Sequence, residues 1–221
     1  AFKRTELVLL QYHLQVPGPD PLTNPDSEAR AAYYHARGTP LMLINGKEVA
    51  PGGGSRQVGL QKYMEYRSEI EKQLSQKSPA KIELRGTRQG DQLDINVKLS
   101  DVAEPGEKLR LRLAIVEEMV RFTGFNGLRL HHEVVRGLPG GPEGVAVTEA
   151  NMIIRESVDI AKLKVSLADS LANLEKQHGE FPGKPLELNH LGVAAILQDD
   201  ATQTVVQAAF VSLETEAKAG E

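Results

Sequence analysis

Strict alternation of apolar and polar residues in the middle of the chain constrains its fold more than any other feature. Residues 91–101 read DQLDINVKLSD and residues 108–118 read KLRLRLAIVEE, with apolar side chains on every second position. Successive side chains of a β-strand point to opposite faces of the sheet, so this period predicts strands. We therefore expect sheets with one packed face and one face in contact with water.

Further apolar runs extend this pattern towards the C-terminus. Strands are predicted at 129–135, 156–161, 191–198 and 204–213, and DDATQ between the last two is typical of a hairpin loop. A short helix is expected within 167–181. Together these segments predict an antiparallel β-sandwich over residues 79–214, followed by a frayed tail at 215–221.

The first third of the chain has a different pattern. Residues 6–16, ELVLLQYHLQV, form a nearly continuous apolar run, which favours a strand buried on both faces. The next nine residues, PGPDPLTNP, contain four prolines and therefore form a loop. The sequence leaves the cis or trans state of three of these prolines open: Pro17, Pro19 and Pro21.

A helix is predicted after this loop. Asn24 is a suitable N-cap and Pro25 occupies the first helical position. The helix is expected to run to about Ala36 and to stop at Gly38, since glycine commonly ends helices.

A hairpin and a long helix complete this region. LMLI at 41–44 predicts a short strand, and Asn45-Gly46 is typical of a tight turn, so residues 47–50 should return antiparallel. After PGGGS at 51–55, Ser55 is expected to cap a helix that ends near Gln76. Its apolar residues lie along one stripe: Leu60, Tyr63, Met64, Ile70 and Leu74.

This order of elements resembles the second half of a thioredoxin fold. The stretches LLQYHLQVPGPDPLTNPDSEAR, GTP, NGK and GGG, with ILQDDATQTVVQAA near the end, are similar to uncharacterised bacterial proteins in which a thioredoxin-like domain precedes an all-β domain. The resemblance implies an α+β protein with a partial thioredoxin-like α/β domain over residues 1–77. It also implies a cis bond before Pro40 and a Thr39 that faces the binding site, where unpaired backbone can hydrogen-bond an extended peptide.

The resemblance further implies a missing element. Thioredoxin-like domains carry their reactive cysteines on a strand–helix unit upstream of the segments found here, and this chain contains no cysteine. The missing strand belongs between residues 6–14 and 41–44, which would otherwise lie about 10 Å apart with unpaired backbone. We expect another segment or a swapped copy to fill this gap, or direct pairing of the two strands to close it.

Three classes of function remain open. The resemblance implies an exported, extracytoplasmic bacterial protein that is non-catalytic and binds a protein or peptide. The alternative is a fragment of a thiol–disulfide oxidoreductase whose cysteine pair lies upstream, since this chain has no thiolate to react. The third is a ligand- or carbohydrate-binding β-sandwich. A homo-oligomer and a swapped dimer are both compatible with the sequence.

Composition excludes several partners and cofactors. The net charge is −4 with both signs interspersed, and the chain has no Trp, which argues against a nucleic-acid surface. No apolar run approaches the ~20 residues of a membrane-spanning helix. Without cysteine there is no iron–sulfur cluster and no thiolate zinc site, and we predict no cofactor.

Two weaker sites are considered beside Thr39 and Pro40. Tyr12 and His13 end the first predicted strand, where α/β sheets place ligands, so we include them among the peptide-facing residues. Gly53, Gly54 and Ser55 precede a helix, whose first N–H groups can hold an anion. A flexible connector is the simpler interpretation of these glycines.

Three adjacent pairs of titratable residues are predicted to have no catalytic or metal-binding role. His131 and His132 should point to opposite faces of a strand, so they cannot share a metal ion. The carboxylates at 117–118 and 199–200 are paired in sequence only, and the second pair lies in a predicted turn, where Asp is common.

Overall fold

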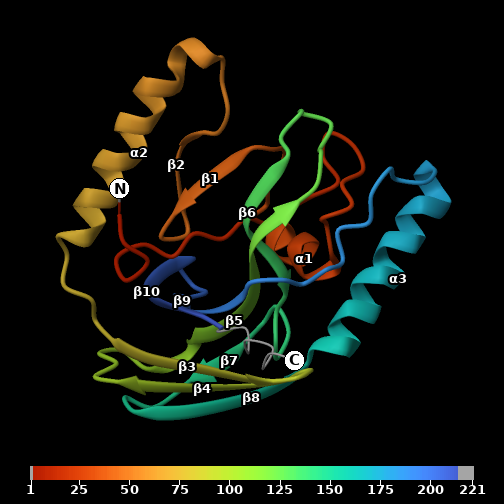
Figure 1. The fold of residues 1–221 in the computed structure, drawn as a ribbon. Helices are drawn as coiled ribbons and strands as arrows, with labels where there is room; N and C mark the ends of the chain where they lie inside the picture. Colours follow the sequence, from red (N-terminus) through yellow and green to blue (C-terminus); the bar gives the residue numbers. More distant parts are fainter. Residues whose placement is uncertain (1, 214–221) are drawn as a thin grey trace, which may run out of the picture.

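The structure, a computed structural model that describes residues 2–213, combines helices with antiparallel sheets (Figure 1). Two sheets pack face to face and bury a common core. The larger has the order β10-β9-β5-β6, with the short β7 beside β5, and the smaller has the order β3-β4-β8. The strands of the larger sheet are β5 (Gly106–Arg121), β6 (Leu130–Gly137), β7 (Val145–Val147), β9 (Leu191–Asp199) and β10 (Thr204–Ser212). Those of the smaller sheet are β3 (Lys81–Gln89), β4 (Gln92–Ser100) and β8 (Met152–Asp159).

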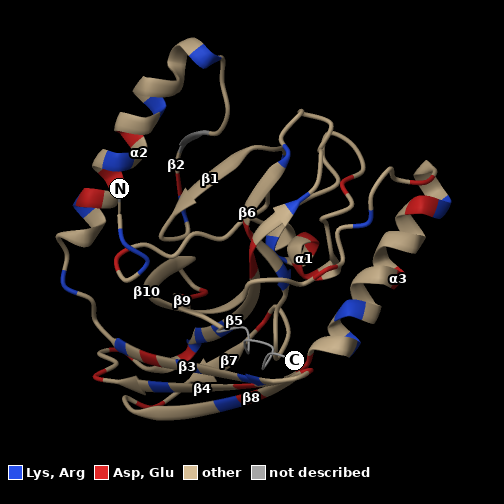
Figure 2. Cartoon of the chain, viewed as in Figure 1, with Lys and Arg blue, Asp and Glu red and all other residues tan. Residues whose placement is uncertain are grey.

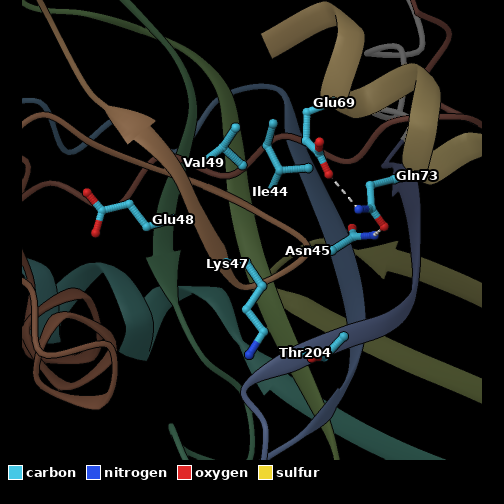
Figure 3. A pocket seen from close by; sticks show the side chains of 8 residues that line it. All are labelled: Ile44, Asn45, Lys47, Glu48, Val49, Glu69, Gln73 and Thr204. Atoms are coloured by element: carbon cyan, nitrogen blue, oxygen red, sulfur yellow. Dashed lines mark hydrogen bonds between the residues drawn. The ribbon is translucent and has the colours of Figure 1, made fainter. Parts of the chain in front are cut away.

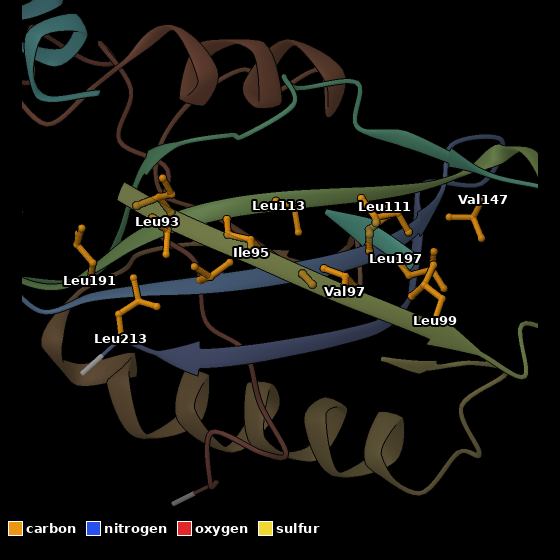
Figure 4. Close-up of a cluster of buried hydrophobic side chains, with 14 of the residues drawn as sticks. Leu93, Ile95, Val97, Leu99, Leu111, Leu113, Val147, Leu191, Leu197 and Leu213 are labelled. Atoms are coloured by element: carbon orange, nitrogen blue, oxygen red, sulfur yellow. The ribbon is translucent and has the colours of Figure 1, made fainter. Parts of the chain in front are cut away.

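The predicted alternation is confirmed in β4, whose residues are exposed and buried in turn. Its buried side chains meet those of β5 and β9 across the space between the two sheets (Figure 4). The labelled core residues of these three strands are Leu93, Ile95, Val97, Leu99, Leu111, Leu113, Leu191 and Leu197. Apolar burial on this scale is the main stabilising term of such a domain.

The expectation of a wet outer face is wrong for β5. Arg112, Ala114 and Val116 on that face are buried, as are the neighbouring residues of β9. Val8, Leu10 and Tyr12 of the N-terminal segment pack against this face. The larger sheet is therefore covered on both sides, which local periodicity cannot reveal.

The prediction of a strand at 6–16 is also wrong. Only Gln11 makes a bridge, a parallel one to Val134, through hydrogen bonds of 2.8 and 2.9 Å with the backbone of residues 133 and 135. Three apolar side chains of this run, Val8, Leu10 and Tyr12, instead pack on the outer face of the sheet, whereas Leu9 and Val16 are exposed. Within the described residues no backbone hydrogen bond joins 6–14 to 41–44, so the alternative of direct pairing is not realised.

Helix α1 (Pro25–Tyr33) begins as predicted and ends early. The side chain of Asn24 accepts a hydrogen bond from the N–H of Ser27 at 2.9 Å, which confirms the N-cap. His35 takes a left-handed φ of 53°, and this conformation ends the helix three residues before the predicted position, Ala36.

Strands β1 (Leu41–Ile44) and β2 (Lys47–Pro51) form a separate two-stranded antiparallel sheet. The predicted turn is confirmed, because Asn45 and Gly46 both have positive φ, at 48° and 79°. A 3₁₀ turn (Arg56–Val58) then leads into α2 (Gly59–Leu74), which stands at the side of the molecule (Figure 1). Ser55 makes no capping hydrogen bond, and α2 begins three residues later than predicted.

Helix α3 (Ile160–His178) is longer than predicted. The side chain of Asp159 accepts a hydrogen bond from the N–H of Lys162 at 3.0 Å and so caps the helix. Residues 160–161 therefore begin α3 instead of ending a strand. Strands β3 and β7 were not predicted from the sequence.

Candidate functional site

Thr39 and Pro40 lie at an exposed corner in front of β1. The Thr39 hydroxyl donates a hydrogen bond of 2.5 Å to the carbonyl of Val16. The peptide bonds Thr39–Pro40 and Val16–Pro17 are both cis. The hydrogen bond between Thr39 and Val16 holds the end of the N-terminal segment beside the start of β1.

The glycines after β2 pack closely on Pro40. A Cβ atom added to Gly52 would lie 2.1 Å from the Pro40 carbonyl oxygen, and one added to Gly53 would lie 2.9 Å from its Cγ. Gly53 also has a φ of 71°, which favours glycine. Close approach to the proline thus explains two of the three glycines, and the anion site at Gly53, Gly54 and Ser55 stays a prediction.

Strand β1 is paired on one side only in the part of the chain that the structure describes. We call its other side the open edge of β1. Exposed sheet edges usually carry charges that prevent pairing with other chains, and the edge strand β8 follows this rule with Arg155, Glu156 and Asp159. The sequence of β1, LMLI, has no charged residue. Its open edge is therefore suited to pair with a further extended segment.

A polar pocket of about 310 Å³ lies between the β1–β2 hairpin, α2 and β10 (Figure 3). In the figure Gln73 is hydrogen-bonded to Asn45 and Glu69, at 3.2 and 2.7 Å. The hydrogen bond from Gln73 lowers the pKa of the Glu69 carboxyl, which is therefore ionised at neutral pH. The lining residues are Ile44, Asn45, Lys47, Glu48, Val49, Glu69, Gln73 and Thr204.

Tyr12 belongs to a different region from Thr39. Its ring packs on the outer face of the larger sheet, beneath α1. Burial raises the pKa of Tyr12 to about 12, although the nearby Arg30 guanidinium acts in the opposite direction. Its hydroxyl is therefore neutral at physiological pH and is placed for packing.

His13 lies in a small cluster with Asp20 and His131. Its Nδ1 is 2.7 Å from an Asp20 carboxylate oxygen, and its ring meets the edge of the His131 ring at 5.1 Å. Burial lowers the pKa of His131, whose Nε2 lies 3.0 Å from the carbonyl oxygen of Phe122. Burial acts to raise the pKa of Asp20, but the hydrogen bond and charge of His13 outweigh it and lower that pKa.

The two adjacent histidines lie on opposite sides of β6, with His131 buried and His132 exposed. Among residues 2–213 no group of three or more His, Asp or Glu side chains is placed to hold a metal ion. The carboxylates at 117–118 also separate. Glu117 lies in the interior, 3.5 Å from the buried Arg136, while Glu118 pairs with Arg4 on the other side.

The structure contains a buried polar cluster between α1 and the larger sheet that was not predicted from the sequence. We call it the arginine cluster. Arg112 donates two hydrogen bonds to the carboxylate of Asp200, at 2.8 and 2.9 Å, in a fork geometry. Tyr33 donates to the same carboxylate at 2.8 Å. The members are Arg30, Tyr33, Tyr34, Arg112, Gln198 and Asp200.

Arg30 has no carboxylate partner within this cluster. It is 3% exposed and donates to the side-chain oxygens of Gln198 and Tyr34, at 2.7 and 3.0 Å. Its guanidinium lies 4.4 and 4.8 Å from the ring centres of Tyr33 and Tyr34, so aromatic rings replace a counter-ion. The cluster fastens α1 to the sandwich, and within it Nε and Nη1 of Arg30 are buried without a hydrogen-bond partner among the described residues.

Comparison with known proteins yields a structural likeness only. No protein-family model matches the chain, and no curated protein matches it. The fold is similar to the X-ray crystal structure of protein AGR_C_4864 from Agrobacterium tumefaciens, with a TM-score of 0.51 and 16% sequence identity over 96% of this chain and 82% of that chain. At this identity the likeness concerns the fold alone. Within residues 2–213 no helix is long and apolar enough to cross a membrane.

Proposed function

We propose that this chain is an exported, extracytoplasmic bacterial protein of the thioredoxin-like superfamily that binds a protein segment without catalysing a reaction. The open edge of β1 is the observation that supports this most directly. Strand β1 is uncharged, it is paired on one side only within the described residues, and the exposed Thr39 and Pro40 precede its first residue, Leu41.

An extended peptide would bind there by adding a strand. Its backbone would pair with the N–H and C=O groups of β1 that point away from β2. Its first residues would meet Thr39 and Pro40. Alternate side chains would point to the two faces of the hairpin, so the sequence preference would follow a period of two.

The non-catalytic assignment rests on what the chain offers chemically. It has no cysteine, so it contains no thiolate for disulfide exchange. His13, which the sequence analysis includes among the peptide-facing residues, is engaged by Asp20. Binding through the backbone needs neither a nucleophile nor a proton donor.

A peptide selection on the full chain tests this proposal. A random dodecapeptide library is selected on the immobilised protein, and the strongest peptide is mapped by amide chemical shifts. We expect the largest shifts at residues 39–44 and smaller ones along the control edge β8. Methylating alternate amide nitrogens of the peptide should weaken binding by about tenfold for each hydrogen bond lost.

Two matched variants sharpen the result. Leu41→Lys places a charge on β1 and should weaken binding, whereas Ile153→Lys on the edge strand β8 should not. Shifts centred on β8, or a peptide whose N-methylated forms bind equally well, would contradict strand addition at β1.

A further inference from the structure

Helix α2 exposes its apolar side to solvent. Leu60 is 66% exposed, Tyr63 55%, Met64 58% and Leu74 44%. The spacing of these four residues places them on one face of the helix. An amphipathic helix of a globular protein usually buries such a face, so this arrangement is the reverse of the ordinary one.

The opposite side of α2 faces the body of the protein and is mainly polar. Lys62, Glu65, Glu69 and Gln73 on that side are half-buried, together with the apolar Tyr66 and Ile70. Glu69 and Gln73 line the pocket, and the hydrogen bond from Asn45 to Gln73 ties the helix to the hairpin (Figure 3). In this orientation the face formed by Leu60, Tyr63, Met64 and Leu74 has no cover from residues 2–213.

Outside residues 2–213 the given sequence offers little apolar surface. It holds Ala1 and the stretch ETEAKAGE at 214–221, in which alanine is the only apolar side chain. An anionic membrane surface is also a poor match, since α2 carries three basic and three acidic residues, with the two signs interspersed (Figure 2). A protein surface with apolar residues and mixed charges fits α2 better.

The sequence of α2 is complementary to itself in the antiparallel direction. When two α2 helices run antiparallel about a two-fold axis between them, residues whose numbers sum to 138 face each other. This register places Arg67 opposite the partner's Glu71 and Met64 opposite the partner's Leu74, and by symmetry each contact occurs twice. Within one chain Arg67 and Glu71 already form an exposed ion pair of 2.8 Å in the middle of this face.

We propose that α2 pairs with α2 of a second copy of this chain and forms a two-fold symmetric dimer. Two Met64–Leu74 contacts flank the four central charges, and Tyr63 packs at each end. A pair of 16-residue helices is smaller than a standard interface. We therefore expect a reversible dimer with a dissociation constant on the order of micromolar.

Sedimentation equilibrium of the full chain over roughly 1–500 µM tests this proposal. We expect a monomer–dimer equilibrium that Met64→Glu weakens at least about tenfold. Ile153→Glu is the matched control, because Ile153 is also 56% exposed but lies on β8. A chain that stays monomeric throughout, or a dimer that tolerates Met64→Glu, would overturn the proposal. The second result would point to a swapped dimer.

The charges and the register are tested separately. Arg67→Glu should weaken the dimer, and the double change Arg67→Glu/Glu71→Arg should restore it. Because the chain has no cysteine, Met64→Cys/Leu74→Cys gives a clean cross-linking test. These positions are about 15 Å apart along one helix, so a disulfide between them must join two copies. Failure to cross-link while the dimer persists would refute the register.

Binding to vesicles is the alternative outcome. Co-sedimentation of a monomeric chain with phosphatidylcholine–phosphatidylglycerol vesicles, lost in Met64→Glu, would assign this face to a membrane and contradict the dimer. Neither result affects the peptide footprint on β1, so this proposal and the proposed function fail independently.

Discussion

The sandwich and the N-terminal α/β layer differ in how far each buries its own surface. The core between the two sheets consists of apolar side chains that are almost all inaccessible to solvent (Figure 4). From residue 31 to residue 79 no described side chain is buried. The core between the two sheets is fully buried, and the N-terminal segment covers the outer face of the larger sheet. The layer of β1, β2 and α2, in contrast, leaves an edge and an apolar face open. We infer that the first region supplies stability and the second supplies binding surface.

The two regions are nevertheless joined at defined points. The arginine cluster fastens α1 to the larger sheet, and the N–H of Val205 donates a hydrogen bond of 3.0 Å to the carbonyl of Asn45 in the β1–β2 turn. These hydrogen bonds tie α1 and the β1–β2 hairpin to the larger sheet. A site that is held in its bound shape before the ligand arrives loses less conformational entropy on binding.

The largest expected contrast comes from shortening one leucine in each region. Leu111→Ala in the sandwich core should lower the free energy of unfolding by about 2–5 kcal/mol, since it leaves a cavity. Leu60→Ala on α2 should change it by less than about 0.5 kcal/mol in dilute solution. Urea unfolding measures both, and equal losses would remove the distinction between the regions.

A smaller loss of stability is expected from a substitution at the corner that contains Thr39 and Pro40. Gly52→Ala places a Cβ atom against the Pro40 carbonyl and should cost about 1–3 kcal/mol. Gly59→Ala is the control, because nothing lies within 4 Å of the added atom, and it should stabilise α2 by about 0.4–1 kcal/mol. If thermal unfolding shows that both variants are neutral, the close packing on Pro40 is not a determinant of stability.

Removing one hydrogen bond from the arginine cluster should lower the free energy of unfolding by a modest amount. Tyr33→Phe removes the donor to Asp200 and is expected to cost about 0.5–1.5 kcal/mol. Tyr63→Phe on the exposed face of α2 should cost less than about 0.5 kcal/mol in the monomer. A Tyr33→Phe variant as stable as the unmodified chain in urea would show that the cluster does not fasten α1.

The smallest expected effect is a change in the free energy of unfolding with pH. The folded state lowers the pKa of His131 below its usual 6.5, so the unfolded state binds more protons as the pH falls. This contribution to stability is present above that pKa and is lost on acidification. The charges nearby are those of His13, Asp20 and His132. Between about pH 7.5 and 5.5 the unmodified chain should lose more stability than His131→Asn, and parallel curves would argue against this.

The sequence predicted those elements whose determinants are local. The period-two pattern of β4, the cap at Asn24 and the turn at Asn45-Gly46 each depend on a few neighbouring residues. Strand β3 was missed because Gly86 interrupts its alternation. That glycine makes room for Leu213, whose Cδ2 would lie 2.6 Å from an added Cβ, and this contact is distant in sequence.

The sequence did not predict the features that depend on contacts between distant segments. The apolar run at 6–16 has the composition of a buried strand. A segment that packs onto the face of a sheet can have the same composition. Similarly, no local pattern around Arg30 or Arg112 predicts their hydrogen bonds to Gln198 and Asp200, which are distant in sequence. The start of α3 was the exception, because Asp159 followed by leucines at 163, 167, 171 and 174 is a helical signal that was present in the sequence.

Hydrogen–deuterium exchange of the free protein tests the contrast between the two regions most directly. The amides of β9 lie in the middle of the sandwich and should exchange only through global unfolding. The amides of β1 that point to its open edge should exchange on the order of 10³-fold faster or more, because they need no unfolding to meet water. Protection of every amide of residues 41–44 to the level of β9 would contradict an open edge and the binding site proposed there.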